Sequence, residues 1–123
     1  MTELVGDLAG RSARQVVEDH LDSIGTGDPA AMAADYAADA VLVRGEASYV
    51  GAAVIGEYFE SVPRRLAGGE VSFGERTDHG DGRISVRWRI GGGPADGTSG
   101  CDTFTVTSGA ISHQSVALDH ADF

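Results

Sequence analysis

The chain has 123 residues and a formal net charge of −10 at pH 7, a length suited to one domain with a modest core. The negative charge argues against nucleic acid and anionic membrane as partners, and no apolar run is long enough to cross a bilayer. Lysine is absent, which excludes Schiff-base and lysine-nucleophile mechanisms. Cys101 is the single cysteine and residues 1–7 lack a signal-peptide pattern, so we expect one cytoplasmic domain spanning residues 1–123.

The first predicted helix begins at Ser12 and ends near residues 25–27, which contain two glycines. Apolar residues at helical spacing form one stripe along this helix: Ala13, Val16, Val17, Leu21 and Ile24. His20 falls on the same stripe and therefore faces the core. A buried histidine requires either a hydrogen-bond partner or a functional role, and the spacing alone leaves both interpretations open.

A short second helix is predicted over residues 28–36, with Met32 and Tyr36 as its inward-facing pair. Residues 41–44 form a β-branched run that predicts a strand. Gly51 then precedes a third helix, with a stripe formed by Val54, Ile55, Tyr58, Phe59, Val62 and Leu66. Pro63 is expected to kink or end this helix near Val62.

After residues 68–69 the hydrophobic period changes from helical to two, which indicates strands. Strands are predicted over residues 71–77, 84–90, 102–107 and 111–118. The first two are joined by a hairpin at the Asp81 and Gly82 pair. Asp102 shares a strand face with Phe104 and Val106, an apolar setting that raises the pKa of a carboxyl group. The element order favours an α+β fold with helices covering one face of a curved antiparallel sheet.

Two segments resemble a known family. The sequence GDPAAMAADYAADAV at 27–41, followed by Gly51, Ile55 and Phe59, and the pattern D.f.v..G.I at 102–111 are similar to the NTF2-like superfamily, which includes ketosteroid isomerases and SnoaL-like polyketide cyclases. The resemblance covers residues 12–118. It implies a cone in which three N-terminal helices pack on a curved antiparallel sheet and enclose an apolar pocket. It also implies a homodimer formed through the outer sheet face, and a small hydrophobic molecule as the ligand.

The resemblance also implies site residues. His20 stands where ketosteroid isomerases carry a tyrosine that donates to the developing oxyanion, and Asp102 matches their second oxyanion donor. Tyr36 matches a supporting tyrosine. Phe59 occupies the place of another tyrosine, and its neighbour Tyr58 offers a substitute hydroxyl.

The main departure from the isomerase pattern is Arg44, which stands where the family carries its catalytic aspartate. Arginine cannot be deprotonated in a protein, so a standard steroid isomerase is not expected. The Asp-Arg-Asp pattern of limonene-type epoxide hydrolases is also missing from residues 87–89.

Two hypotheses about function remain. The first is a cofactor-free enzyme in which His20 and Asp102 form an acid–base dyad and Arg44 holds a substrate oxygen, giving isomerisation, cyclisation or dehydration of a hydrophobic carbonyl compound. The carboxylate is expected to raise the pKa of the imidazole. The predicted substrate-binding residues are Tyr36, Tyr58, Phe59, Trp88, Phe104 and Leu118. Asp119 is an alternative acid or base, although strand alternation places it on the opposite face.

The second hypothesis is a non-catalytic ligand-binding or dimerisation module on the same fold. In that case Arg44 and Asp102 form a buried ion pair and His20 bonds to a backbone carbonyl. A purely structural domain would fill the pocket with Phe59, Phe73 and Trp88. Neither His113 nor His120 pairs with another histidine or carboxylate at metal-ligand spacing, so neither hypothesis includes a metal.

Overall fold

The computed structural model describes residues 10–119 and contains helices packed on one sheet within that range. The helices are α2 (Ala13–Thr26), α3 (Pro29–Ala33), α4 (Ala52–Glu60) and α5 (Val62–Leu66). The strands are β1 (Tyr36–Arg44), β2 (Ala47–Val50), β3 (Glu70–Gly80), β4 (Arg83–Gly91), β5 (Ser99–Thr107) and β6 (Ala110–Leu118). The predicted α+β class is confirmed. The expectation about residues 1–7 lies outside the described part of the chain.

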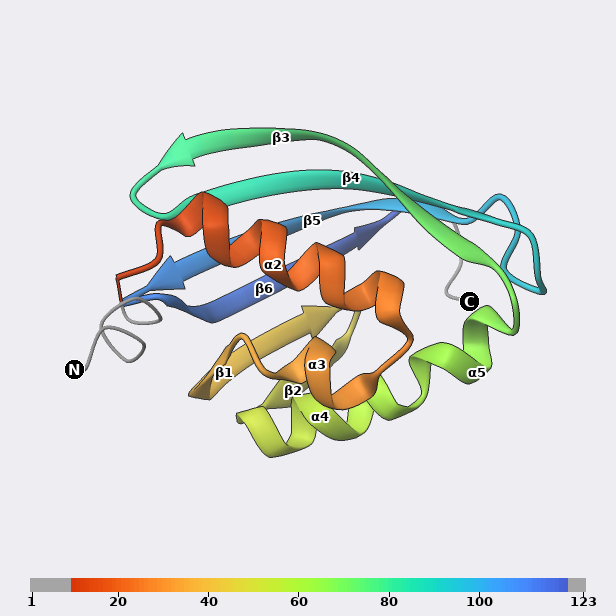
Figure 1. Cartoon of the computed structure of the whole chain (residues 1–123), viewed down its shortest axis with the longest axis horizontal. Helices are drawn as coiled ribbons and strands as arrows, with labels where there is room; N and C mark the ends of the chain where they lie inside the picture. The colour runs from red at the N-terminus through yellow and green to blue at the C-terminus, as the bar shows by residue number, and fades with distance from the viewer. Residues whose placement is uncertain (1–9, 120–123) are drawn as a thin grey trace.

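The strands form a curved sheet in the order β2-β1-β6-β5-β4-β3 (Figure 1). Strands β3 to β6 make the predicted antiparallel meander. Strand β1 instead runs parallel to β6, with Arg44 opposite Val116. The sheet is therefore mixed rather than wholly antiparallel. The parallel pair is possible because a long stretch of chain, including α4 and α5, separates the two strands in sequence.

Helix α2 has the predicted boundaries. The hydroxyl of Ser12 accepts a hydrogen bond from the backbone N–H of Gln15 at 3.1 Å, and Gly27 ends the helix with a φ of 72°. The Gln15 side chain donates to Asp19 at 2.7 Å, so the capping box is only half formed. Local capping thus explains where this helix starts and stops.

The second predicted helix is wrong at its C-terminal end. Helix α3 stops at Ala33, and Tyr36 is the first residue of β1, opposite Ile111 of β6. The backbone N–H of Ile111 donates to the carbonyl of Asp35 at 2.8 Å, so pairing with β6 replaces the last helical turn. Tyr36 is nevertheless buried, as predicted.

The structure also contains β2, a short edge strand that the sequence pattern does not indicate. It follows a turn in which Gly45 has a φ of 59°, and it pairs antiparallel with the end of β1. The third predicted helix is interrupted as expected near Val62. Helix α4 ends at Glu60, and Pro63 lies in the first turn of α5.

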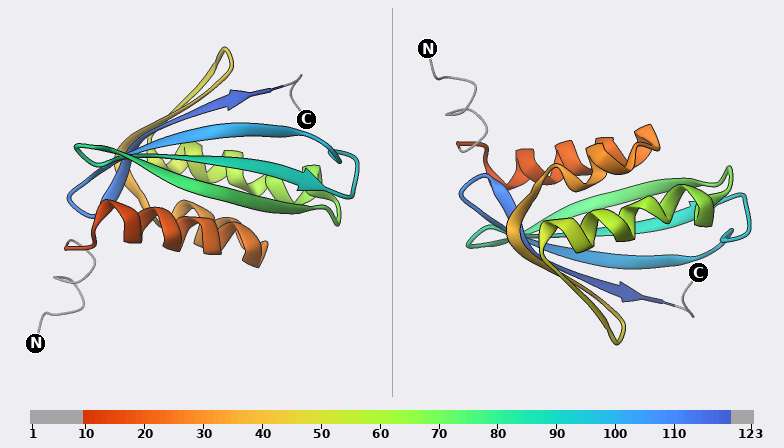
Figure 2. Two further views of the ribbon diagram at one scale, coloured as in Figure 1. Left: turned by 90° about the horizontal axis from the view of Figure 1, so that it is seen from above. Right: turned by 90° about the horizontal axis from the view of Figure 1, so that it is seen from below.

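The core lies between the helices and the concave face of the sheet. Helix α2 contacts β3, β4, β5 and β6, whereas α4 contacts β1 and β2, so the helices cover different parts of one face (Figure 2). The fully buried apolar residues include Val16, Val17, Leu42, Ile55, Ile84, Phe104 and Ile111. No helix within residues 10–119 is long and apolar enough to span a membrane.

A half-buried arginine, Arg11, connects the start of α2 to the rest of the domain. Arg11 donates to Asp19 at 3.0 Å, to Asp35 at 2.9 Å and to the carbonyl of Gly109 at 2.9 Å. These partners come from α2, from the residue before β1 and from the turn between β5 and β6. Asp35 is itself buried, so its charge depends on Arg11.

We expect Arg11→Met to lower the free energy of unfolding by about 2 kcal/mol or more, because it leaves the Asp35 carboxylate buried without its cation. The matched control is Arg14→Met, which removes an exposed arginine that lies 3.8 Å from Glu18 on the same helix. Its cost is expected to stay below about 0.5 kcal/mol. Urea denaturation measures both. If both variants lowered the free energy of unfolding equally, the hydrogen bonds of Arg11 would not be what stabilises the position of the helix.

Candidate functional site

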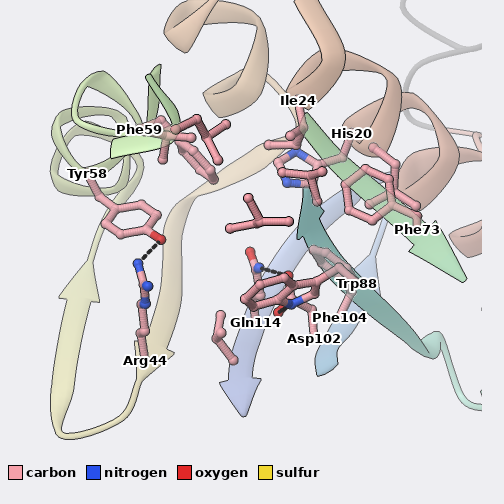
Figure 3. A pocket seen from close by; sticks show the side chains of 16 residues that line it. His20, Ile24, Arg44, Tyr58, Phe59, Phe73, Trp88, Asp102, Phe104 and Gln114 are labelled. Carbon is pink, nitrogen blue, oxygen red and sulfur yellow. Dashed lines mark hydrogen bonds between the residues drawn. The ribbon is translucent and has the colours of Figure 1, made fainter. Parts of the chain in front are cut away.

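A pocket of about 80 Å³ opens between α2, the α4–α5 segment and the inner face of the sheet (Figure 3). Most of its lining is apolar and includes Leu21, Ile24, Phe59, Phe73, Trp88 and Phe104. Five polar or charged side chains also line it, and these are His20, Arg44, Tyr58, Asp102 and Gln114. The pocket therefore has the general character of a ligand site, in which a few polar groups interrupt apolar walls.

Most of the candidate residues from the sequence analysis lie around this pocket. His20, Arg44 and Asp102 all line it, as do four of the predicted substrate-binding residues: Tyr58, Phe59, Trp88 and Phe104. Tyr36 and Leu118 do not. Tyr36 lies in the core beside His20, and Leu118 packs against the cluster of Trp88, Ile90 and Ala95.

Asp102 on β5 is held by two neutral donors. The indole N–H of Trp88 donates to its Oδ1 at 2.9 Å, and the amide of Gln114 donates to its Oδ2 at 3.0 Å. Loss of water on burial raises the pKa of Asp102 to about 6, although both hydrogen bonds and the charge of Arg44 oppose that change. No cation of residues 10–119 lies within ion-pair distance of this carboxylate. The predicted increase in its pKa is confirmed.

A glycine lets Trp88 reach this carboxylate. Gly100 lies directly opposite Trp88 in the β4–β5 ladder, while Asp102 is two residues further along β5. A Cβ atom at position 100 would lie 2.6 Å from Cζ2 of the indole. The absence of a side chain therefore allows the indole to lie across β5 with its N–H toward Asp102.

His20 does not form the predicted dyad. Its Nε2 lies 3.3 Å from the Tyr36 hydroxyl, and its ring packs edge-on against Phe59 and Phe104. Burial lowers the pKa of His20 to about 4, and the nearby backbone of Met32 only partly opposes this. The expected increase in this pKa is wrong, because His20 is surrounded by apolar and neutral groups rather than by a carboxylate.

Gln114 on β6 is the site residue that the sequence analysis missed. It is buried, it accepts a hydrogen bond from the Tyr36 hydroxyl through Oε1, and it donates to Asp102 through Nε2. His20 and Asp102 are thus connected through two intermediate side chains. The missed signal was a polar residue two positions before Val116, on the inward face of the last predicted strand.

Arg44 at the end of β1 is buried and donates to the hydroxyl of Tyr58 at 2.6 Å. Its guanidinium also lies 5.6 Å from the centre of the Tyr58 ring. The alternative in which Arg44 and Asp102 form an ion pair is wrong, because the described contacts of Asp102 are with Trp88 and Gln114. Figure 3 shows the Arg44–Tyr58 pair on one side of the pocket and Asp102 with Gln114 on the other.

The Tyr58 hydroxyl is arranged as a donor. Its oxygen accepts from Arg44, and no residue among those described accepts the hydroxyl proton in return. Burial raises the pKa of Tyr58 despite the opposing charge of Arg44, so the phenol keeps its proton at neutral pH. No group of three potential metal-binding side chains is present in residues 10–119.

Comparison with protein families agrees with this architecture. Residues 17–114 match the family model of the SnoaL-like domain, which covers most of the chain. The chain belongs to the SnoaL-like domain family. The predicted relationship to the NTF2-like superfamily is thereby confirmed. Among curated protein sequences, none matches this chain significantly.

Solved structures show the same SnoaL-like fold at low identity. A proposed polyketide cyclase from Sinorhizobium meliloti is 23% identical, with 82% of this chain and 92% of that one covered and a TM-score of 0.71. SalBIII, an epoxide hydrolase/cyclase-like enzyme with a role in pyran ring formation in salinomycin, is 20% identical, with coverages of 86% and 89% and a TM-score of 0.72. An NTF2-like protein of unknown function from Cytophaga hutchinsonii is 11% identical, with coverages of 88% and 90% and a TM-score of 0.71.

Trp88 is the single tryptophan, so its fluorescence should report the charge of Asp102 directly. We expect the emission of this SnoaL-like protein to titrate with a midpoint of about 6, the pKa of Asp102. The transition should disappear in Asp102→Asn and persist in Asp119→Asn, which changes an exposed carboxylate bound to Arg87 and Ser99. A midpoint below pH 4.5 in the wild type would contradict the assigned environment.

Asp102 should also make stability depend on pH. Because the pKa of Asp102 is raised from 3.8 to about 6 in the folded state, the folded protein binds the proton more tightly than the unfolded chain between these values. Its contribution to the free energy of unfolding therefore falls as pH rises from about 4 to about 6. Asp102→Asn should be more stable than the wild type by about 2 to 3 kcal/mol at pH 7.5, with little gain at pH 4. Urea denaturation across this range measures the difference, and a gain independent of pH would refute the assignment.

Proposed function

We propose that this protein is a cofactor-free enzyme of the SnoaL-like type that moves a proton on a small hydrophobic carbonyl compound, with Asp102 as the general base. The reaction class is isomerisation, cyclisation or dehydration. One observation carries the proposal. A carboxyl group lines an apolar pocket, its pKa is about 6, and its hydrogen bonds come from the neutral donors Trp88 and Gln114.

The geometry suggests how the steps divide between residues. Asp102 takes a proton from the carbon next to the substrate carbonyl, and the C–H electron pair forms the enolate while charge moves to the carbonyl oxygen. Tyr58 donates its hydroxyl proton as a hydrogen bond to that oxygen, and Arg44 strengthens this donor by bonding to its oxygen. The proton on Asp102 then returns to another carbon, or to a departing hydroxyl group. In a cyclisation the enolate carbon instead attacks a second carbonyl, whose π electron pair moves to its oxygen, and that alkoxide takes the proton from Asp102.

His20 has no direct role in this proton transfer. With a pKa of about 4 it is neutral at pH 7, and its ring nitrogens contact the core rather than a carboxylate. The role proposed for the dyad therefore passes to Asp102 alone.

Two structurally similar proteins support the reaction class. One is described as a proposed polyketide cyclase and the other as an enzyme with a role in pyran ring formation. An enolate carbon closes a ring through a C–C bond, whereas a pyran ring closes through a C–O bond and needs a base that takes the proton of the attacking hydroxyl. A base and an oxyanion donor on opposite pocket walls would serve either closure.

A second candidate, a non-catalytic ligand-binding module, is supported by Arg44, which stands where the isomerase pattern has its catalytic aspartate. The pocket volume of about 80 Å³ limits both candidates, because it is smaller than a cavity of about 150 Å³ that holds benzene. A substrate must therefore be small, insert only one end, or displace side chains at the entrance. Native mass spectrometry of the purified protein discriminates between the candidates, because a carrier would release its retained molecule chemically unchanged.

The enzyme proposal is tested with a panel of small enolisable ketones and β-hydroxy ketones. Turnover is measured by the decrease of the substrate signal. We expect Asp102→Asn to lower kcat/KM by at least about 100-fold and Tyr58→Phe by about 10- to 100-fold. The matched control is Tyr49→Phe, since the ring of Tyr49 packs at a tilt against that of Tyr58, with ring centres 4.9 Å apart, but does not line the pocket.

The pH profile gives a second readout. Because only ionised Asp102 accepts a proton, kcat/KM should rise with pH and level off above a midpoint of about 6. Turnover that survives in Asp102→Asn, or falls equally in Tyr49→Phe, would refute this assignment of roles.

A further inference from the structure

We propose that Tyr36 and His20 are positioning residues for Asp102 that act through Gln114, by fixing which end of its amide meets the carboxylate. Neither of them is a hydrogen-bond partner of Asp102. The inference rests on the proposed function for its catalytic meaning, because it concerns the same proton-accepting group. Its physical content is a directed chain of hydrogen bonds that can be measured without substrate.

This series of hydrogen bonds joins four side chains from four different elements. His20 Nε2 on α2 lies 3.3 Å from the hydroxyl of Tyr36 on β1, and this hydroxyl donates to Oε1 of Gln114 on β6. Nε2 of Gln114 then donates to Oδ2 of Asp102 on β5 at 3.0 Å. The exposed fractions of His20, Tyr36 and Gln114 are 2%, 7% and 4%, so water has little access to replace these contacts.

The number of available protons sets the direction of the chain. The single hydroxyl proton of Tyr36 is used in the bond to Gln114. The contact between Tyr36 and His20 therefore needs a proton on Nε2 of the neutral imidazole. In this tautomer Nδ1 carries no proton and is an acceptor without a hydrogen-bond partner among residues 10–119, while the backbone of Met32 also lies near the ring. Every donor in this series of hydrogen bonds then points toward Asp102.

This direction matters because the amide of Gln114 has two different ends. With Nε2 toward Asp102, the amide stabilises the ionised carboxylate. If the amide were turned by 180°, its oxygen would face Oδ2 of Asp102. Only the protonated form of Asp102 could then make a hydrogen bond to Gln114. The proton that Tyr36 donates to Oε1 favours the first orientation, and His20 keeps Tyr36 turned toward Gln114. Loss of the Tyr36 hydroxyl would remove this preference and favour protonated Asp102.

The other groups around Asp102 do not duplicate this role. The ionisable side chains that face it or act on it electrostatically are His20 from α2, Tyr36 and Arg44 from β1, and Tyr58 from α4. Cys101 precedes it on β5, and Trp88 from β4 supplies the second neutral donor. Among the described contacts of Asp102, only Gln114 also bonds to Tyr36.

The experiment titrates Asp102 without substrate, by Trp88 fluorescence and by NMR of the carboxyl carbon. Tyr36→Phe keeps every atom that touches Asp102, yet we expect it to raise the midpoint by about 0.5 to 1 pH unit. Gln114→Met, which removes the donor itself, should raise the midpoint at least as much. Tyr49→Phe removes a hydroxyl that is not part of this series of hydrogen bonds, so it should leave the midpoint unchanged. Nitrogen NMR of the wild type should show His20 protonated at Nε2.

A lower stability of Tyr36→Phe with an unchanged midpoint would overturn the proposal, because it would show a purely structural role for Tyr36. If Tyr36→Phe does not fold, Gln114→Met and the His20 tautomer decide. An unchanged midpoint in Gln114→Met, or a proton on Nδ1 of His20, would overturn the inference. These measurements need no turnover. A protein without activity on the ketone panel could still show the shift in the Asp102 midpoint, and an active protein could fail to show it, so the two proposals are tested separately.

Discussion

The site depends on the carboxylate of Asp102, which burial separates from bulk water and which has no ion-pair partner among residues 10–119. Asp102 is stabilised by an indole and an amide, whose dipoles oppose the effect of burial but do not cancel it, so the pKa of Asp102 rises to about 6. An arginine at bonding distance would hold the group ionised and weaken it as a base. The rest of the architecture keeps this environment in place: Gly100 makes room for the indole, and the packing of α2 against four strands excludes solvent.

The placement of Arg44 follows the same constraint. Its charge lies in the pocket wall, where it still lowers the pKa of Asp102 through space, and its hydrogen bond within residues 10–119 is to the neutral phenol of Tyr58. The cation therefore acts on the far side of the pocket through a hydroxyl that keeps its own proton. This separation lets one group accept a proton while another stabilises the negative charge that results. A direct ion pair between Arg44 and Asp102 would have removed both capacities at once.

The fold was predictable where local chemistry determines it. Ser12 and Gly27 set the ends of α2, Pro63 separates α5 from α4, and alternation identifies β4. The end of α3 was not predictable, because residues 34–36 have no local signal against a further helical turn. Pairing of Tyr36 with Ile111, a contact between distant parts of the sequence, converts that segment into β1. Long-range strand pairing overrides a weak helical preference, and a single sequence does not show which strands will pair.

The sequence identified most of the residues that line the pocket, but it did not identify Gln114 or the hydrogen bonds that connect the site. Periodicity correctly turned His20 and Asp102 inward, yet a pattern of spacing says nothing about what lies between two inward groups. Gln114 shows why. Thr105 and Val106 pair with His113 and Ile111, so β6 contains one extra residue, and this bulge allows both Ile111 and Gln114 to face the core. The buried amide keeps the imidazole and the carboxylate from meeting. A matching position in a related enzyme therefore identifies a place in the pocket, whereas the role of that place depends on neighbours that this chain has changed.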